Sequence, residues 1–263
     1  MLNEIARPYQ YVRCIARVYF RQKIKKLLTG EGLASARQHL RRSRHQPAVP
    51  LEADAIIQTI DREQFERIRQ RHAVEHPGED WPKYLDLPRW IATNLRRIRR
   101  TELDISPPRR VLDLGSGAGY FAYIAQLLGH QVTGLDIDEV QMFAEMTRLL
   151  GVKRIIHRVR PFVPLPNLGD NFDLITGFQV CFNNHKQAGL WGIPEWNFFL
   201  DDLAQHLNPG GRVWLELNPE HDGECYTPEL KKFFQARGAR VDEYRVAFNP
   251  ILPAPSSVST TAR

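Results

Sequence analysis

The feature that most constrains this fold is a short apolar segment that runs directly into three closely spaced glycines. Residues 110–114 read Arg-Val-Leu-Asp-Leu, which is typical of a short buried strand. Gly115, Gly117 and Gly119 follow at alternate positions, and the apolar residues 120–125 then predict a helix. In a strand, glycine-rich turn and helix, backbone N–H groups can approach a ligand closely, and a Cβ atom would block that approach. The sequence therefore predicts a ligand-binding turn here.

The glycine spacing and two acids indicate the kind of ligand. A dinucleotide-binding turn needs a third glycine at the position of Tyr120. Asp113 at the strand end would repel a pyrophosphate but would attract an ammonium group. Asp136 ends the next predicted strand, where a carboxylate can accept hydrogen bonds from two ribose hydroxyls. A ligand with a ribose and a cationic amino acid, such as S-adenosylmethionine (SAM), fits these residues better than NAD.

Four segments resemble motifs of the class I SAM-dependent methyltransferases, in the same order: residues 111–119, 135–138, 172–176 and 207–215. The resemblance covers the chain from about Trp81 to Phe248. It implies SAM as the cofactor and S-adenosylhomocysteine (SAH) as the product. The cofactor-binding residues that it and the glycine turn suggest are Asp113, Gly115, Ser116, Gly117, Gly119, Tyr120, Asp136, Ile137, Phe162, Phe178 and Gln179.

The alternation of predicted strands and helices favours an α/β fold with a doubly wound, mainly parallel sheet. Strands are expected at 111–114, 131–136, 153–158, 172–178, 212–217 and about 240–248. Helices are expected between them at 119–129, 139–150, 194–207 and 227–237. We expect four parts along the chain: a basic α-helical N-terminal extension and linker at 1–50, a helical cap at 51–105, a SAM-binding Rossmann-like domain at 106–250, and a disordered tail at 251–263.

The expected cap contains two helices. One is expected over about 52–74, and the second begins near Asp86, with arginines 96, 97, 99 and 100 away from its apolar side. In the resembled family a helix at this place often covers the SAM pocket. Tyr84 and Trp90 are therefore candidate lid residues, and ordinary core aromatics are the alternative.

The sequence departs from the family pattern in two places. Many members carry an acid after the third strand that contacts the adenine amino group, whereas residues 157–162 contain no carboxylate. We therefore expect Phe162 to pack on the adenine while a backbone group supplies the polar contact. The family usually ends in an antiparallel strand pair, but the sequence indicates one strand over about 240–248, with residues 249–253 as a stub at most.

The positive charge is concentrated at the N-terminus. The net charge is +6, yet residues 1–45 hold eleven Lys and Arg against two Glu, which leaves about −3 for the remainder. Residues 9–28 have the spacing of an amphipathic helix. It is expected to pack on its own domain, to lie on an anionic membrane surface or to bind nucleic acid, and nucleic acid is not favoured.

Several sequence features bound the cellular context. No run approaches the length of a membrane span, and the N-terminus lacks the pattern of a secretory signal. The three cysteines are too widely spaced to indicate a disulfide framework or a metal site. We therefore expect a cytoplasmic protein, with peripheral membrane contact left open, and the sequence does not determine the oligomeric state.

Methyl transfer from a sulfonium requires alignment and exclusion of water, so no metal is expected. A hydroxyl acceptor also needs a base. His185, in the segment after the fourth predicted strand, is the candidate because imidazole titrates near neutral pH, and an ordinary loop histidine is the alternative. Asn183, Asn184 and Trp191 are candidate substrate contacts, and Trp191 is alternatively a core residue.

The family signature of amino-group methylation is absent: no Asp or Asn is followed by two prolines and an aromatic residue. We therefore predict O-methylation of a small-molecule or saccharide-like acceptor. One alternative is an RNA methyltransferase that uses the basic extension. Another is a catalytically silent SAM-binding protein docked to a membrane or partner. Glu216 and Asn218, at the end of the fifth strand, either border the acceptor pocket or are solvated turn residues.

Overall fold

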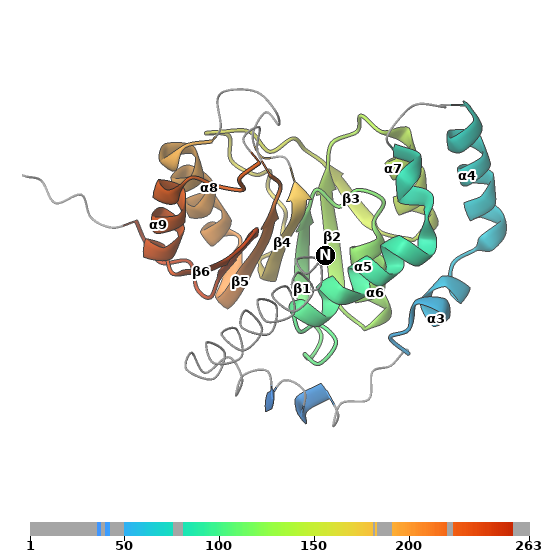
Figure 1. The fold of residues 1–263 in the computed structure, drawn as a ribbon, viewed down its shortest axis with the longest axis horizontal. Helices are drawn as coiled ribbons and strands as arrows, with labels where there is room; N and C mark the ends of the chain where they lie inside the picture. Colours follow the sequence, from blue (N-terminus) through green and yellow to red (C-terminus); the bar gives the residue numbers. More distant parts are fainter. Residues whose placement is uncertain are drawn as a thin grey trace, which may run out of the picture. The chain divides into compact units, whose positions relative to one another are not determined.

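The structure is a computed structural model that describes residues 36–37, 40–42, 50–75, 81–180, 182, 191–219 and 223–254. The chain divides into two compact units, Met1–Gln46 and Pro47–Arg263. In the first unit, residues 36–37 and 40–42 are helical, and the predicted helix over 9–28 lies outside the described residues. All the elements labelled in Figure 1 belong to the second unit.

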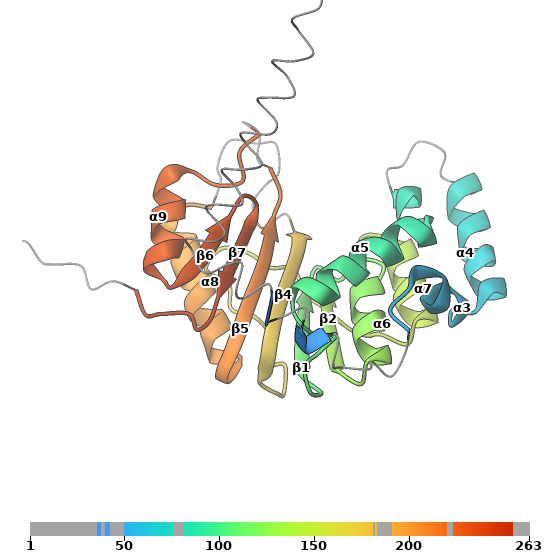
Figure 2. The same cartoon turned by 60° about the horizontal axis from the view of Figure 1, so that its bottom comes forward.

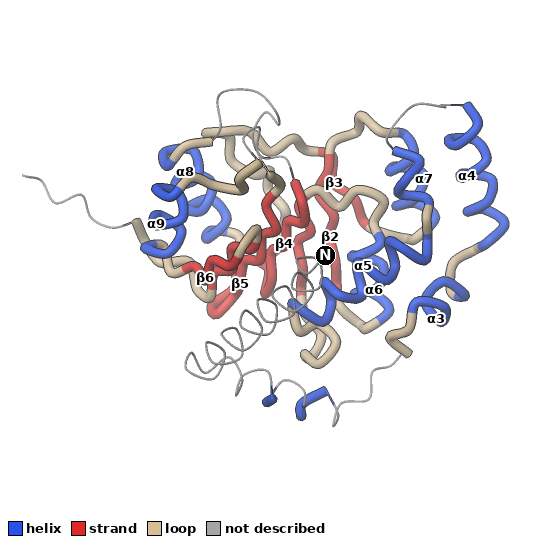
Figure 3. The backbone as a smooth tube through the Cα atoms, viewed as in Figure 1, coloured by secondary structure: helices blue, strands red, loops and turns tan. Residues whose placement is uncertain are grey.

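The second unit is built on a seven-stranded sheet with the order β3-β2-β1-β4-β5-β7-β6 (Figures 2 and 3). The strands are β1 Arg110–Leu114, β2 Gln131–Asp136, β3 Lys153–Ile156, β4 Phe172–Val180, β5 Leu207–Leu217, β6 Ala239–Asp242 and β7 Arg245–Phe248. The first five pair in parallel, and β7 is antiparallel to both β5 and β6. This confirms the predicted α/β fold with a mainly parallel sheet. The strand order reverses between β1 and β4, where such sheets bind ligands beyond their carboxyl ends.

Helices cover both faces of this sheet. The helices of this unit are α3 Ala53–Gln58, α4 Arg62–Glu75, α5 Leu87–Arg100, α6 Tyr120–Leu127, α7 Gln141–Leu149, α8 Ile193–Gln205 and α9 Pro228–Ala236, with a 3₁₀ turn, η1, at Trp81–Leu85. Of these, α3 packs on α5, and α4 packs on α7. Successive residues of a strand point to opposite faces, so Val111 packs with the core under α5 and α6 while Leu112 packs with the core under α8 and α9. Figure 2 shows the two helical layers on either side of the strands.

Two predicted elements differ from the structure. The helix expected over 52–74 is interrupted, because Asp61 accepts a hydrogen bond from the Gln64 N–H (3.0 Å) and caps a new helix. The single strand expected over 240–248 was wrong: β6 and β7 form a hairpin that turns at Glu243 and Tyr244. Glu243 adopts a left-handed φ of 51°. Nothing in the sequence marks this turn, since glutamate is not a residue type that signals a positive φ.

Candidate functional site

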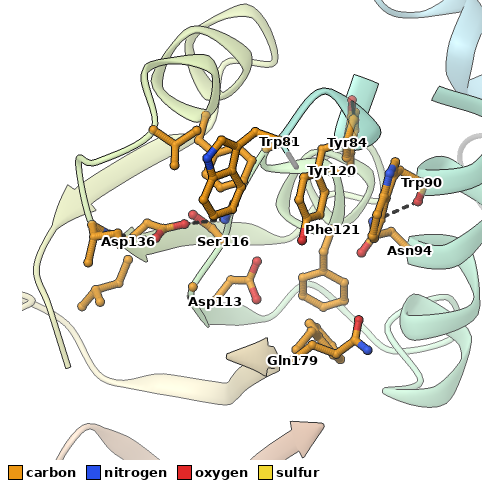
Figure 4. Close-up of a pocket in the computed structure, with 18 of the residues that line it drawn as sticks. Trp81, Tyr84, Trp90, Asn94, Asp113, Ser116, Tyr120, Phe121, Asp136 and Gln179 are labelled. Carbon is orange, nitrogen blue, oxygen red and sulfur yellow. Dashed lines mark hydrogen bonds between the residues drawn. The ribbon is translucent and has the colours of Figure 1, made fainter. Parts of the chain in front are cut away.

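A cavity of about 390 Å³ lies at the carboxyl ends of β1, β2 and β4, beneath η1 and α5 (Figure 4). Its size falls in the range of pockets that hold one small ligand. Most of the predicted cofactor-binding residues line it: Asp113, Gly115, Ser116, Gly117, Tyr120, Asp136, Ile137, Phe178 and Gln179. The fold therefore brings together residues that are up to 66 positions apart in the chain, from Asp113 to Gln179.

The glycine turn has the strained backbone that its sequence predicts. Gly117 and Gly119 have φ values of 53° and 81°, a region that L side chains rarely adopt. The Gly117 N–H donates to Asp136 Oδ2 at 2.5 Å, which ties the turn to the end of β2. Gly119 does not line the cavity and instead packs closely against α7, where a Cβ would lie 3.0 Å from Thr147 Cγ2.

Gly119→Ala is expected to lower the free energy of unfolding by about 2–3 kcal/mol, because it adds a steric clash to a strained φ. Gly129→Ala is the matched control, since Gly129 has a similar φ of 87° but nothing within 4 Å of the position that a Cβ would occupy. The free energy of unfolding of this control should fall by about 1 kcal/mol, because only the backbone strain is added. Urea denaturation of both variants measures the difference, and equal losses would contradict the role of the Thr147 contact.

Asp136 is held in a fixed orientation by two backbone amides. Its Oδ2 accepts from Gly117 as above, and its Oδ1 accepts from the Ile137 N–H at 2.7 Å. Burial raises the pKa of Asp136, and these two hydrogen bonds oppose that rise. Each carboxylate oxygen has more than one lone pair, so Asp136 can still accept hydrogen bonds from a ligand in the cavity.

Asp113 is almost completely buried, with 2% of its surface exposed. Its Oδ1 accepts a hydrogen bond from Thr176 Oγ1 at 2.8 Å. Burial nevertheless raises the pKa of Asp113 to about 7, against the lowering effects of that hydrogen bond and of Arg97. A cationic ligand group placed beside this carboxylate would be favourable, because it would replace part of the lost solvation.

Arg97 adds a buried guanidinium to the same cavity. Its three nitrogens donate to Asn94 Oδ1 at 3.1 Å, Gln179 Oε1 at 3.2 Å and Glu216 Oε2 at 3.3 Å. The guanidinium also lies over the Phe178 ring, 4.6 Å from its centroid. The cavity therefore presents a cation as well as carboxylates.

Glu216 anchors this arginine. Its side chain is 4% exposed, and its other oxygen accepts from Arg100 Nη1 at 3.1 Å. The sequence suggested that Glu216 either borders the acceptor pocket or is a solvated turn residue. The structure shows neither, because Glu216 is a buried ion-pair partner that does not line the cavity. Asn218 does line it, and its Nδ2 donates to the Gln179 carbonyl at 2.7 Å.

The expectation that Arg97 lies away from the apolar side of α5 was wrong, and Asn94 was also missed. Both are buried and line the cavity. Asn94 falls three positions after Ile91 and four before Ile98, in the middle of the apolar stripe. A polar residue in that stripe was the available signal, because a buried amide needs a partner.

Aromatic residues of the cap close one side of the cavity. Trp81, Tyr84 and Trp90 line it, and Figure 4 shows them on the opposite side from Asp113 and Gln179. The Tyr84 and Trp90 rings stack with centroids 4.5 Å apart. Tyr120 Oη donates to the Tyr84 carbonyl at 2.8 Å, which fixes the cap to the start of α6. Tyr84 and Trp90 are thus both packed together and exposed to the cavity.

Gln179 occupies an unusual backbone conformation at the end of β4. Its φ is 57°, in the left-handed region where non-glycine residues are uncommon. Such strain is found where the surrounding structure holds a residue in place for a purpose. Here two hydrogen bonds hold Gln179 in place: its carbonyl accepts from Asn218, and its side-chain Oε1 accepts from Arg97.

Other predicted site residues lie elsewhere. Phe162 does not line this cavity: it is 55% exposed, in a turn closed by the Arg160–Val163 bridge, and its ring contacts the Phe198 ring (centroids 5.9 Å apart) beside a separate hollow. Trp191 is 4% exposed and packs in an aromatic core cluster with Phe182 and Trp196. Neither Phe162 nor Trp191 therefore lines this cavity, and their adenine and substrate contacts stay predictions. His185, Asn183 and Asn184 lie outside the described residues.

The described residues contain neither a candidate metal site nor a membrane-spanning helix. No group of three or more His, Cys, Asp or Glu in that part of the chain could hold a metal ion. Within the same described ranges, no helix is long and apolar enough to cross a membrane.

Residues 86–245 match the model of a family of methyltransferase domains, and the match includes most of the cavity lining and most of the sheet. The chain belongs to the class I SAM-dependent methyltransferases. The match begins at the cap of α5 and ends in β7, so it includes Arg97 as well as the glycine turn.

Curated relatives cover part of the chain. A ribosomal protein L11 methyltransferase of Syntrophotalea carbinolica is 37% identical over 41% of this chain and 32% of its own length. A probable S-adenosylmethionine-dependent methyltransferase of Mycolicibacterium smegmatis is 28% identical over 51% of this chain and 53% of its own. The chain therefore spans between a third and about half of the length of these relatives.

Among solved structures, the SAM-bound amino pentose methyltransferase CalS10 of Micromonospora echinaspora is 26% identical. The likeness covers 56% of this chain and 54% of that chain, with a TM-score of 0.34.

Proposed function

We propose that this chain transfers the methyl group of SAM to a hydroxyl of a small-molecule or saccharide-like acceptor. The observation that carries the cofactor assignment is that two carboxylates, the buried Asp113 and the partly buried Asp136, line one cavity beside the glycine turn. Neither has a cationic side chain within hydrogen-bonding distance among the described residues, so each is suited to ligand groups that donate hydrogen bonds.

The charges in the cavity match the charges of the cofactor. Asp136 would accept hydrogen bonds from the ribose hydroxyls, and Asp113 would face the ammonium of the methionine moiety. Arg97 would face its carboxylate, since it is the guanidinium that lines the cavity next to Asp113 and Gln179. When bound, SAM supplies a methyl group already activated by the sulfonium. The protein then has to align the acceptor and exclude water, which the packed aromatic wall favours.

A neutral hydroxyl acceptor fits the remaining groups better than a cationic amine. Asp113 and Asp136 are the carboxylates among the described lining residues, and both are assigned to the cofactor. Near the end of β4 the cavity is lined by the amide side chains of Asn94, Gln179 and Asn218, which also bond within the protein. Amides can both donate to and accept from hydroxyl groups, whereas an ammonium would lack a counter-charge.

The cofactor assignment is tested by calorimetric titration of the purified chain with SAM, SAH and NAD in parallel. Micromolar binding of SAM and SAH without binding of NAD is the expected result. Binding of NAD alone would overturn the proposal. Acceptor classes are then compared by SAH release with sugars, phenols, amines and RNA, and a preference for amines would overturn the O-methylation assignment.

His185→Ala is expected to lower turnover on a hydroxyl acceptor by about 10²-fold or more while leaving SAH affinity unchanged, because a positioned base contributes to the rate and not to cofactor binding. Gln187→Ala, two residues further on, is the control and should keep normal turnover. Steady-state kinetics and calorimetry measure both quantities. Full activity of the histidine variant would remove His185 as the base.

The concentration of positive charge in residues 1–45 supports one second candidate, an RNA acceptor. That function predicts that deletion of residues 1–45 abolishes activity and that activity falls steeply with salt. The small-molecule function predicts that the deletion leaves turnover intact. A chain that binds SAH tightly but turns over no acceptor would instead be a SAM-binding protein without catalysis.

A further inference from the structure

Arg154 is a buried arginine of β3, the strand at one edge of the sheet. Its side chain is only 8% exposed, whereas the preceding residue of the strand, Lys153, is exposed. In the register of the sheet, Arg154 lies opposite Gly134 of β2, two residues before Asp136. Burial of a guanidinium is costly unless its charge and its donors are compensated, so the contacts of this side chain need an explanation.

The Arg154 guanidinium contacts the two residues that follow Asp136 at the end of β2. Its Nη1 donates to Asp138 Oδ1 at 2.9 Å, and its Nη2 donates to the Ile137 carbonyl. A planar guanidinium presents its donors in a fixed geometry, so it can hold two acceptors in one relative orientation. Arg154 therefore ties the backbone that follows Asp136 to β3.

The same short segment orients the Asp136 carboxylate. Ile137 donates its N–H to Asp136 Oδ1 at 2.7 Å and offers its carbonyl to Arg154, so one residue links the two side chains. Burial raises the pKa of Asp136, and the positive charge of Arg154 is among the effects that oppose this rise. Arg154 thus acts on Asp136 both through the backbone and through its charge.

Stability alone does not account for this arrangement. The side chain of Asp138 is 61% exposed, and an ion pair with an exposed partner contributes little to the free energy of unfolding. Arg154 Nε is buried and has no hydrogen-bond partner among the described residues, which is a cost to folding. Such local costs are typical of functional sites, where the benefit lies in what a residue orients.

We infer that Arg154 is a positioning residue: by holding the segment after Asp136, it keeps that carboxylate directed at the ribose hydroxyls of the cofactor. This inference rests on the proposed function, in which Asp136 accepts hydrogen bonds from those hydroxyls. Arg154 does not line the cavity, so it acts on the ligand through Asp136 and not by direct contact. Its replacement should therefore weaken ligands that carry the hydroxyls and spare a ligand that lacks them.

The test compares two ligands and two proteins in one cycle. The ligands are SAH and its 2′,3′-dideoxy analogue, which lacks the two hydroxyls. The proteins are the wild type and Arg154→Met, which has an unbranched side chain without charge. Calorimetry should show that the wild type binds SAH about a hundredfold more tightly than the analogue, and that the variant does so only about tenfold. The affinity of the variant for the analogue should stay within about twofold of the wild type.

Lys153→Met is the matched control, because Lys153 is the exposed neighbour of Arg154 in the same strand. It should keep the full preference for SAH. If Arg154→Met does not fold, Arg154→Lys takes its place, since lysine keeps the positive charge but cannot hold both acceptors with one planar group. The preference of this variant should fall about threefold, and an unchanged preference would overturn the inference.

The outcomes separate this inference from the proposed function. If the wild type binds neither SAH nor SAM, the proposed function fails and the inference fails with it. If the wild type binds SAH and the dideoxy analogue equally, cofactor binding stands, but Asp136 does not hold the ribose and Arg154 has no such role. If Arg154→Met weakens both ligands by the same factor, the proposed function stands and Arg154 only supports the fold.

Discussion

Asp113→Asn is expected to make the ligand-free protein more stable while weakening SAH binding about tenfold or more. Burial raises the pKa of Asp113 to about 7, so the fold carries the cost of a desolvated carboxylate at neutral pH. Asparagine is neutral and can still accept the hydrogen bond from Thr176 Oγ1. The free energy of unfolding should rise by up to about 4 kcal/mol at pH 7, and the loss of one charged hydrogen bond to the ligand should lower affinity.

The pH dependence of Asp113 has a definite sign. The pKa of Asp113 in the folded protein lies above the ordinary value of an unfolded aspartate. Below pH 4, Asp113 is therefore protonated in both the folded and the unfolded protein, and its burial does not lower the free energy of unfolding. Stability is then lost as the pH rises from about 4 through about 7, and the asparagine variant should lack this loss. Because a bound ammonium requires the carboxylate form, wild-type SAH affinity should rise about fivefold from pH 6 to pH 7. Affinity that does not change over that interval would contradict the assignment.

Asp173→Asn is a control that should change the free energy of unfolding in the opposite direction. Asp173 lies at the start of β4, away from the cavity, and accepts hydrogen bonds from the Arg110 N–H and from Asn208 Nδ2, both at 2.9 Å. Although partial burial opposes them, these bonds lower its pKa, so its stabilising effect is present at neutral pH and is lost on acidification. The control should therefore be less stable than the wild type at pH 7 and should bind SAH normally. Thermal melting and calorimetry at pH 6 and pH 7 measure both variants.

Arg97→Met is expected to lower the free energy of unfolding by about 3 kcal/mol and to weaken SAH binding. The substitution leaves the buried Glu216 carboxylate with Arg100 alone and leaves Asn94 and Gln179 without their shared donor. Breaking a buried charge pair on one side is costly because the remaining charge stays desolvated. Urea denaturation measures the stability change, and titration measures the binding.

Arg96→Met is the matched control, since Arg96 is the preceding residue of α5 and is exposed. This control should change the free energy of unfolding by no more than about 0.5 kcal/mol. Ligand choice separates the two roles of Arg97. Its replacement should weaken SAH, which has a carboxylate, and should leave unchanged the affinity for 5′-methylthioadenosine, which has none. Equal weakening of both ligands would show that Arg97 acts only through the fold.

Part of the site could be predicted because its chemistry is encoded in adjacent residues. The glycine turn requires left-handed backbone at fixed positions, and Asp113 and Asp136 end the strands that flank it, so short sequence spacing determines where they meet. Phe178 and Gln179 followed from the next parallel strand, because the carboxyl ends of paired parallel strands lie at one edge of the sheet. The prediction for Phe162 depended on a loop without a regular element, where no periodicity fixes the direction of a side chain.

The sequence by itself determined the alternation of strands and helices, the parallel sheet and the carboxylates around the glycine turn, because these depend on hydrophobic period and local backbone requirements. Only the tertiary structure decided that Arg97 points inward to Glu216, 119 positions away, and that residues 240–248 fold back as a hairpin. It also decided that Arg154 is buried against the segment that follows Asp136. Which charges become buried together depends on contacts between distant segments, and no local pattern specifies those contacts.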